Sequence, residues 1–525
     1  MYKVYNPYFA ALIATVGGMM FGFDISSVSA FVSEDAYRTY FGYPDSVTQG
    51  GITAAMSGGS FVGALVAGAL SDWKGRKLAI QTAGFFWIVG AAIQSSSQNL
   101  AQLIIGRFIA GIGIGLASSQ VPVYISEIAP KRIRGRLGSL FQWAVTWGIM
   151  IMFYISYGCT HIEGPASFRT AWGIMILPGI VLMASLFLVP ESPRWLASKD
   201  RWEEAAFIVS KIEAGGNLDD ERAKAELEEV RISVEINRQS KNVSIIDLFA
   251  KGSRTRTFVG VSAQIWQQLT GMNVAMYYVV NLFQMAGYHG NTVLVSSSIQ
   301  YVINVIMTIP ALVFIDSWGR RPMLLLGAVL MMIFMFATAG LMANYGHYVD
   351  SVDGNSNLRW IVDSTSASRA IIACSYLFTA SFAPTWGPGI WLYVSEIFPL
   401  HQRAVANGFC ASFNWIFNFA LAFFVPPAFT NIQWRTYLIF GVFCIAMFFH
   451  VFFMFPETKG KSLEEIEVMW MKKIPAWKTA STHIEVTEEA VLPLDSNEKS
   501  EHATHEEDVE TAAAAPAAAP VSNQA

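Results

Sequence analysis

Long apolar stretches recur along this chain, and they constrain its fold more than any other feature. Each approaches the roughly 20 residues that a helix needs to cross a hydrocarbon layer roughly 30 Å thick. Only 14% of the 525 residues are charged, which fits lipid as the solvent. The sequence predicts an all-α integral membrane protein with twelve transmembrane helices, near residues 8–31, 51–71, 78–96, 100–123, 138–158, 171–189, 258–285, 293–315, 322–345, 368–395, 404–427 and 434–455.

The loops between these stretches predict the orientation. An even number of spans places both termini on one side of the membrane. Basic residues cluster in alternate loops, which the positive-inside rule assigns to the cytoplasm together with both termini. The bases are Lys74, Arg76 and Lys77; Lys131, Arg132, Arg134 and Arg136; Arg320 and Arg321; Arg403; Lys459 and Lys461. The first run is too long for a cleavable signal peptide, so we expect a multi-pass protein of the plasma membrane.

A charged, amphipathic segment lies between spans six and seven, including the run DDERAKAELEEVRISVEINR. Its pattern predicts short helices on the cytoplasmic side. After Pro456 the chain turns polar and ends in AAAAPAAAP, a composition typical of disorder. We therefore expect an N-terminal six-helix bundle, a cytoplasmic helical connector, a C-terminal six-helix bundle and a largely disordered cytoplasmic tail, over residues 1–197, 198–257, 258–455 and 456–525.

Charge and side-chain spacing exclude several functions. The net charge of −4 favours neither nucleic acid nor an acidic partner. No cluster of His, Asp, Ser or Cys has catalytic or metal-ligand spacing, so we expect neither an enzyme nor a metal site. The four cysteines are scattered and resemble small packing residues: Cys159, Cys374, Cys410 and Cys444.

The two halves repeat the same short motifs in the same order, always at cytoplasmic helix ends. DWKGRK at 72–77 matches DSWGRR at 316–321, and YISEIAP at 124–130 matches YVSEIFP at 393–399. The motifs place acids and bases together, which predicts one ion network per half: Asp72, Arg76, Glu127 and Arg134, then Asp316, Arg320, Glu396 and Arg403. We interpret these networks as a cytoplasmic gate. The alternative, that the bases only obey the positive-inside bias, leaves the recurring acids unexplained.

These motifs resemble those of the sugar porters of the major facilitator superfamily, and within them fungal monosaccharide transporters. The resemblance covers roughly residues 8–465 and rests on DWKGRK, RFIAGIGIG, VPVYISEIAP, PESPRW, QQLTGMN and PETKG in family order. It implies the major facilitator fold, two six-helix bundles that rock about a central site. It also implies a monosaccharide substrate, a monomeric functional unit in the lipid bilayer and no cofactor.

Span seven carries amides suited to a neutral polyol, because Gln and Asn both donate and accept hydrogen bonds. Gln264, Gln267 and Gln268 share one helical face. Gly271 can break the helix and turn Asn273 inward. The alternative is that such amides only hold helices together, and for Gln264 both readings stay open.

The resemblance assigns roles to particular residues. It implies that Gln267, Gln268 and Asn273 bind the sugar ring. It adds Gln142, Asn304, Trp391 and Asn414, with Phe21, Tyr277 and Tyr278 flanking the site. The sequence Trp386-Gly387-Pro388-Gly389 predicts a flexible break that lets Trp391 act as an inner gate. Where mammalian glucose facilitators carry a glutamate in span ten, this chain has Ala383.

Asp24 lies inside span one, where an unpaired carboxylate costs roughly 3 kcal/mol on insertion scales. Arg107 in span four is its expected partner. In sugar–proton symporters the matching pair couples transport to protons, so the resemblance implies H⁺ as the coupling ion. The alternatives are proton-independent facilitation and a non-transporting sugar sensor. Single hydroxyls decide between a glucose-like hexose and xylose.

Overall fold

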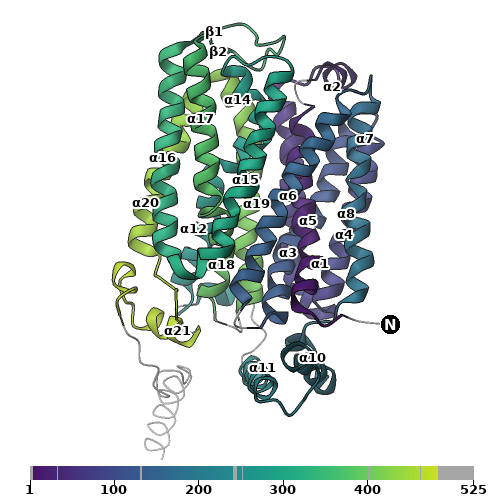
Figure 1. The fold of residues 1–525 in the computed structure, drawn as a ribbon, viewed down its shortest axis with the longest axis vertical. Helices are drawn as coiled ribbons and strands as arrows, with labels where there is room; N and C mark the ends of the chain where they lie inside the picture. Colours follow the sequence, from purple (N-terminus) through teal and green to yellow (C-terminus); the bar gives the residue numbers. More distant parts are fainter. Residues whose placement is uncertain are drawn as a thin grey trace, which may run out of the picture.

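The computed structural model describes residues 4–31, 34–130, 133–239, 245–250, 252–399, 402–461 and 463–482. Figure 1 shows long helices running between two ends of the molecule. We call the end with helices α10 (Trp202–Ala214) and α11 (Glu221–Gln239) the connector side. The opposite end, with strands β1 (Gly346–Tyr348) and β2 (Trp360–Val362), is the hairpin side.

The N-terminal half contains the first six spans. Five are single helices and the sixth is divided at Met175 into two helices and a short 3-10 turn. They are α1 (Pro7–Ser29), α3 (Ser46–Lys74), α4 (Arg76–Ser95), α5 (Leu100–Ile128), α6 (Arg134–Cys159), α7 (Ala166–Ile174), α8 (Ile176–Ser185) and η2 (Leu186–Leu188). A short helix, α2 (Asp35–Tyr40), follows α1 on the hairpin side.

The C-terminal half repeats this plan with two broken spans. Span seven is divided into α12 (Arg254–Leu269), α13 (Met272–Tyr277) and α14 (Val279–Met285), and span ten into α17 (Thr365–Phe382) and α18 (Trp386–Ile397). The others are continuous: α15 (Asn291–Trp318), α16 (Arg320–Tyr345), α19 (Arg403–Asn431) and α20 (Arg435–Met454). Within the described residues, 10 segments are long and apolar enough to cross a membrane. With the two broken spans the arrangement is consistent with the predicted twelve, and the predicted all-α membrane fold class is confirmed apart from the short β1–β2 hairpin.

The two breaks have different causes. Gly271 has φ +83° between α12 and α13, and a Cβ there would lie 2.9 Å from the Phe440 ring, so glycine suits this position on both counts. In span ten, by contrast, the interruption lies at Ala383–Thr385. The predicted break at Trp386–Gly389 is wrong by a few residues, because this Gly-Pro-Gly segment forms the first turn of α18, where proline is tolerated.

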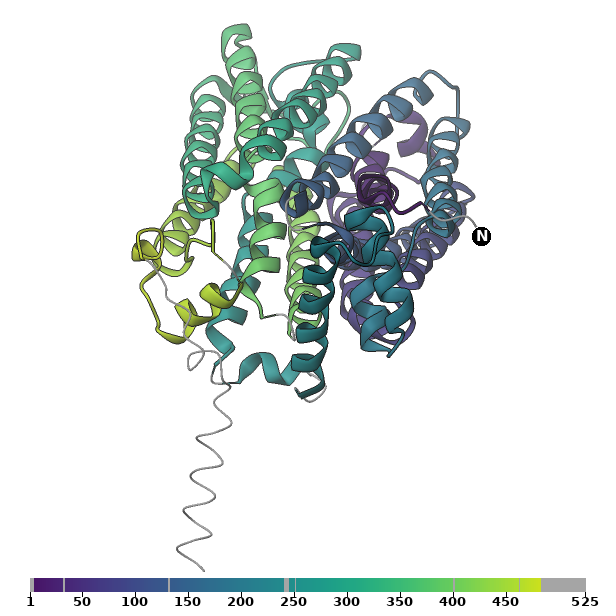
Figure 2. The same ribbon diagram turned by 60° about the horizontal axis from the view of Figure 1, so that its bottom comes forward.

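Close packing joins the helices within and between the halves. At Gly22 a Cβ would overlap the Val145 carbonyl oxygen, so α1 and α6 approach backbone to backbone. Helix α3 lies along α19, where Gly50 meets the Phe423 backbone. Figure 2 shows the purple-to-blue half and the green-to-yellow half as two bundles side by side.

On the connector side, α9 (Pro193–Ser198), α10 and α11 share a small apolar core of Leu196, Ala205, Ile208, Val230 and Val234. The 3-10 helix η3 (Ile245–Phe249) follows. The described part of the predicted tail holds α21 (Leu463–Met471) and η4 (Ala476–Lys478), and Trp477 packs edge-on against Phe453. Residues 483–525, including the alanine-rich end, lie outside the described residues.

Hydrogen bonds on the hairpin side link the two halves. Strands β1 and β2 pair antiparallel, with His347 opposite Ile361. From the loop between them, the Gly354 carbonyl accepts a 2.8 Å hydrogen bond from Arg38 of α2. Nearby, the Tyr157 hydroxyl of the N-terminal half donates to the Asn291 side chain at 2.8 Å. The halves are thus tied together at this end.

Candidate functional site

A cavity lies between the two halves. Eight of the ten residues predicted to contact substrate line it: Phe21, Gln142, Gln267, Gln268, Asn273, Asn304, Trp391 and Asn414. The remaining lining residues are Ile25, Val145, Ile149, Met272, Met276 and Phe382. None of these lining residues carries a formal charge, so the cavity suits a neutral polar ligand.

The glutamines of α12 form one hydrogen-bonded network with α18 and α19. The Gln267 side-chain nitrogen donates to the backbone oxygens of Trp386 and Gly387, at 2.9 and 3.1 Å. Asn414 donates to the side-chain oxygens of Gln264 and Gln267, both at 2.8 Å, and accepts from Gln268 at 2.8 Å. Gln267, Gln268 and Asn414 therefore both hold helices together and line the cavity, whereas Gln264 does not line it.

The network continues past the break in span seven. Asn273, in the first turn of α13, donates to the Gln268 side-chain oxygen at 3.0 Å, as does Asn418. Asn418 also accepts from Ser57 at 2.6 Å, a bond between the two halves. Sequence reasoning missed Asn418. Its spacing of one helical turn from Asn414 was the signal that could have found it.

Aromatic side chains surround the polar groups. Phe21 packs edge-on against Trp415 with ring centroids 4.9 Å apart, and Trp391 lies 6.2 Å from Phe141. Tyr277 and Tyr278 do not line the cavity. Their hydroxyls donate instead to the Asn418 side chain and to the Ala422 backbone, at 3.2 and 3.0 Å.

Asp24 and Arg107 form an ion pair inside the N-terminal half. Arg107 Nη2 lies 2.8 Å from Asp24 Oδ2, and both side chains are completely buried. Arg107 also donates to the Ser27 hydroxyl at 3.2 Å. Among the residues that the structure describes, Asp24 Oδ1 and Arg107 Nε have no hydrogen-bond partner. Because only one carboxylate oxygen meets the guanidinium group, the pair is held less firmly than a bidentate one.

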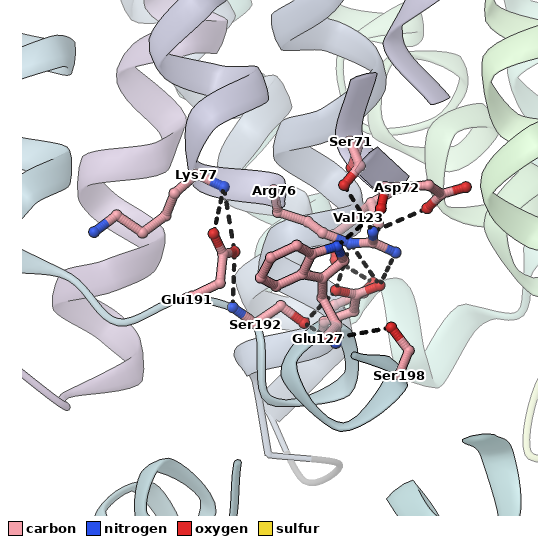
Figure 3. Close-up of polar contacts among 11 residues, drawn as sticks. Ser71, Asp72, Arg76, Lys77, Val123, Glu127, Glu191, Ser192 and Ser198 are labelled. Atoms are coloured by element: carbon pink, nitrogen blue, oxygen red, sulfur yellow. Dashed lines mark hydrogen bonds and ion pairs between the residues drawn. The ribbon is translucent and has the colours of Figure 1, made fainter. Parts of the chain in front are cut away.

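Figure 3 shows the predicted network of the N-terminal half on the connector side. Arg76 Nε lies 3.0 Å from Glu127, and its Nη1 lies 3.0 Å from Asp72. Glu127 also accepts from the Ser192 hydroxyl. Glu191 accepts from the backbone nitrogens of Lys77 and Ser192, at 3.2 and 2.9 Å. Burial raises the pKa of Glu191, while these hydrogen bonds and the Arg76 charge oppose the rise.

The C-terminal half builds the equivalent network. Arg320 Nη2 lies 2.7 Å from Glu396, which also accepts from the Thr458 hydroxyl at 2.7 Å. Glu457 accepts from the backbone nitrogens of Arg320 and Arg321, at 2.9 and 3.0 Å. Arg403 donates to the Phe398 carbonyl at 3.3 Å. The side chains of Arg134 and Asp316 lie outside the described residues.

Comparison with known proteins agrees with this geometry. Residues 10–470 match the family model described as "Sugar (and other) transporter". The chain is 53% identical over 481 residues to a high-affinity glucose transporter of Kluyveromyces lactis, covering 91% of this chain and 87% of that protein. High-affinity glucose transporter 1 of Candida albicans is also 53% identical, covering 91% and 88%. Among solved structures, the proton:xylose symporter XylE bound to 6-bromo-6-deoxy-D-glucose aligns with a TM-score of 0.74 at 27% identity, covering 89% of this chain and 100% of that chain. The chain therefore belongs to the sugar transporter family of the major facilitator superfamily.

Proposed function

We propose that this protein takes up a glucose-like monosaccharide across the plasma membrane, by alternating access and together with a proton. The connector side and both termini face the cytoplasm, and one chain is the functional unit. The observation that carries the proposal is the uncharged cavity between the halves, lined by six carboxamides and three aromatic side chains. The names of the two glucose transporters with 53% identity support the same substrate class.

The cavity offers what a neutral sugar requires. A carboxamide has two donor positions and two acceptor positions, so the positions not used within the network can bind sugar hydroxyls. Trp391 and Phe21 present flat apolar surfaces to the C–H faces of a pyranose. The amides are held in place by one another, which reduces the ordering needed on binding.

Alternating access needs an element with two states. The cross-half bonds of Arg38 and Tyr157 lie on the hairpin side, so this end opens only when they break. Protonation of Asp24 would remove its charge and release Arg107. We propose that this step allows α1 and α5 to rearrange when sugar is bound.

Uptake of radiolabelled D-glucose tests the proposal, using the full chain in a yeast strain without its own hexose transporters. We expect saturable uptake that is faster at pH 5 than at pH 7.5 and that collapses with a protonophore. Saturable uptake indifferent to both conditions would replace symport with facilitation. Absence of uptake, with sugar-dependent binding of a cytosolic protein, would replace transport with sensing.

A further inference from the structure

A second cavity lies on the connector side of the central one. In this structure it has room for about one water molecule, so a larger ligand requires the surrounding helices to move apart. Helices α5, α12, α18 and α19 line it, so both halves contribute. Trp391 lines both cavities, so the two lie in series with this indole at their boundary.

The lining is polar and uncharged. It presents four hydroxyls and two carboxamides, beside apolar surface from Pro122, Val123, Val394, Ala411 and the Trp391 indole. None of these lining residues carries a formal charge, which disfavours an ion or a phosphate. Hydroxyls and amides around an aromatic face suit a polyhydroxyl ligand. The polar residues are Ser118, Ser119, Ser126, Gln264, Ser395 and Asn407.

Two groups in this lining lack a protein partner. Ser119 is only 5% exposed, and its hydroxyl has no hydrogen-bond partner in the part of the chain that the structure describes. The Asn407 side-chain oxygen is also buried and unpartnered. Ser126 and Ser395, in contrast, donate to backbone oxygens of their own helices, at 2.8 and 2.7 Å. Buried polar groups in proteins are nearly always paired, so Ser119 and Asn407 point to a ligand or water in this cavity.

Gln264 connects the two cavities. Its side chain lines the second cavity, while its oxygen accepts a 2.8 Å hydrogen bond from Asn414, which lines the central one. The amide whose role the sequence left open therefore belongs to the second cavity. Resting on the proposed function, we infer that this cavity is a second monosaccharide subsite, occupied after sugar passes Trp391 and before it is released at the connector side.

The inference predicts an asymmetry between entry and exit. A subsite beyond Trp391 contributes to binding from the connector side and leaves binding from the hairpin side unchanged. The test uses yeast cells preloaded with a non-metabolised glucose analogue. In these cells, Ser119→Ala combined with Asn407→Ala should raise at least threefold the internal sugar concentration that gives half-maximal exit. The half-saturation of entry should stay within a factor of 1.5. Ser412→Ala on α19, whose hydroxyl bonds Phe409 and which lines neither cavity, is the matched control.

A labelling experiment keeps the inference testable if the double variant is poorly folded. In Ser119→Cys, D-glucose should slow maleimide labelling of the new thiol at least threefold relative to L-glucose. The labelling of the unsubstituted chain, which has its own cysteines, is subtracted as background. The protection should persist when Gln268→Ala disables the central site. Two results would overturn the second subsite while leaving the proposed function standing. One is an equal shift in the half-saturation of exit and of entry in the double variant, and the other is loss of the D-glucose protection in Gln268→Ala. Absence of saturable uptake by the unsubstituted chain would instead refute the proposed function.

Discussion

The two halves build the same connector-side network but have diverged in the membrane interior. Arg76 binds Glu127 at 3.0 Å in one half, and Arg320 binds Glu396 at 2.7 Å in the other. In each half a hydroxyl from the segment after the last span, Ser192 or Thr458, donates to that glutamate. The repeated motifs thus predict repeated contacts.

At the centre the contributions are unequal. The C-terminal half supplies Gln267, Gln268, Asn273, Asn304 and Asn414 to the cavity, whereas the N-terminal half supplies a single amide, Gln142. The N-terminal half instead holds the completely buried Asp24–Arg107 pair. We interpret this difference as a division between binding sugar in one half and responding to protons in the other.

The largest expected effect comes from breaking the buried ion pair. Arg107→Ala leaves the Asp24 carboxylate buried without its partner, and breaking such a pair costs about 3–5 kcal/mol. We expect loss of the protein from the cell surface and at least a hundredfold loss of uptake. Surface labelling of a tagged chain and glucose uptake measure the two effects.

The control for this change is the double variant with Asp24→Asn, which removes the unpaired charge. It should restore the surface level but leave uptake insensitive to a protonophore. A double variant with normal proton-driven uptake would remove Asp24 from the coupling role.

Matched substitutions in the two connector-side networks should have the next largest effect. Glu127→Gln and Glu396→Gln each weaken a charge-assisted contact with an arginine, worth about 1.5–3 kcal/mol. Because the contacts are equivalent, each change should lower the maximal uptake rate by about tenfold or more. Glu204→Gln, in the exposed pair with Arg201, should leave uptake unchanged. An effect confined to one half would contradict the functional equivalence of the networks.

The amides should show the asymmetry of the interior. Asn414→Ala removes three side-chain contacts to the α12 glutamines, whereas Gln142→Ala removes the lone amide of the other half. At about 0.5–1.5 kcal/mol per hydrogen bond, we expect the half-saturation of uptake to rise about tenfold or more for Asn414→Ala and about threefold for Gln142→Ala. Equal shifts would show that the two halves share sugar binding evenly.

The smallest effect concerns Glu34, next to α2 on the hairpin side. Burial, with a smaller contribution from the Asp35 charge, raises its pKa from 4.5 to about 7, while the neighbouring Ser167 hydroxyl opposes the rise. The folded chain holds this proton more tightly than the unfolded chain, so the contribution of Glu34 to stability is full below pH 4.5 and is lost as pH rises towards 7. Glu34→Gln should reduce the difference in melting temperature between pH 5 and pH 7.5 by on the order of 1 °C. Asp219→Asn, an exposed carboxylate on the connector side, should leave that difference unchanged.

Hydropathy predicted a helical arrangement consistent with twelve spans. Motif spacing predicted the contacts of Arg76 with Asp72 and Glu127 and of Arg320 with Glu396, because the motifs place these residues at neighbouring helix ends. Gly271 predicted the break in span seven, since a positive φ favours glycine. The break in span ten was placed a few residues late, because no glycine marks Ala383–Thr385. Helix α21 has no apolar run long enough to be distinguished from a polar tail.

Tertiary contacts account for what the sequence missed in the site. Asn418 bonds Gln268 of α12 and Ser57 of α3, so its place in the network depends on two other helices. Tyr277 and Tyr278 turn away from the cavity because their hydroxyls bond Asn418 and Ala422. No periodicity in one helix reports contacts that a second helix creates.

Equilibrium binding of radiolabelled D-glucose to the purified full chain tests the central claim most directly. We expect saturable binding that D-glucose displaces and L-glucose does not, and the double variant Gln267→Ala with Asn273→Ala should weaken it at least tenfold. Unchanged binding by this double variant, folded as judged by its melting temperature, would show that the sugar binds elsewhere.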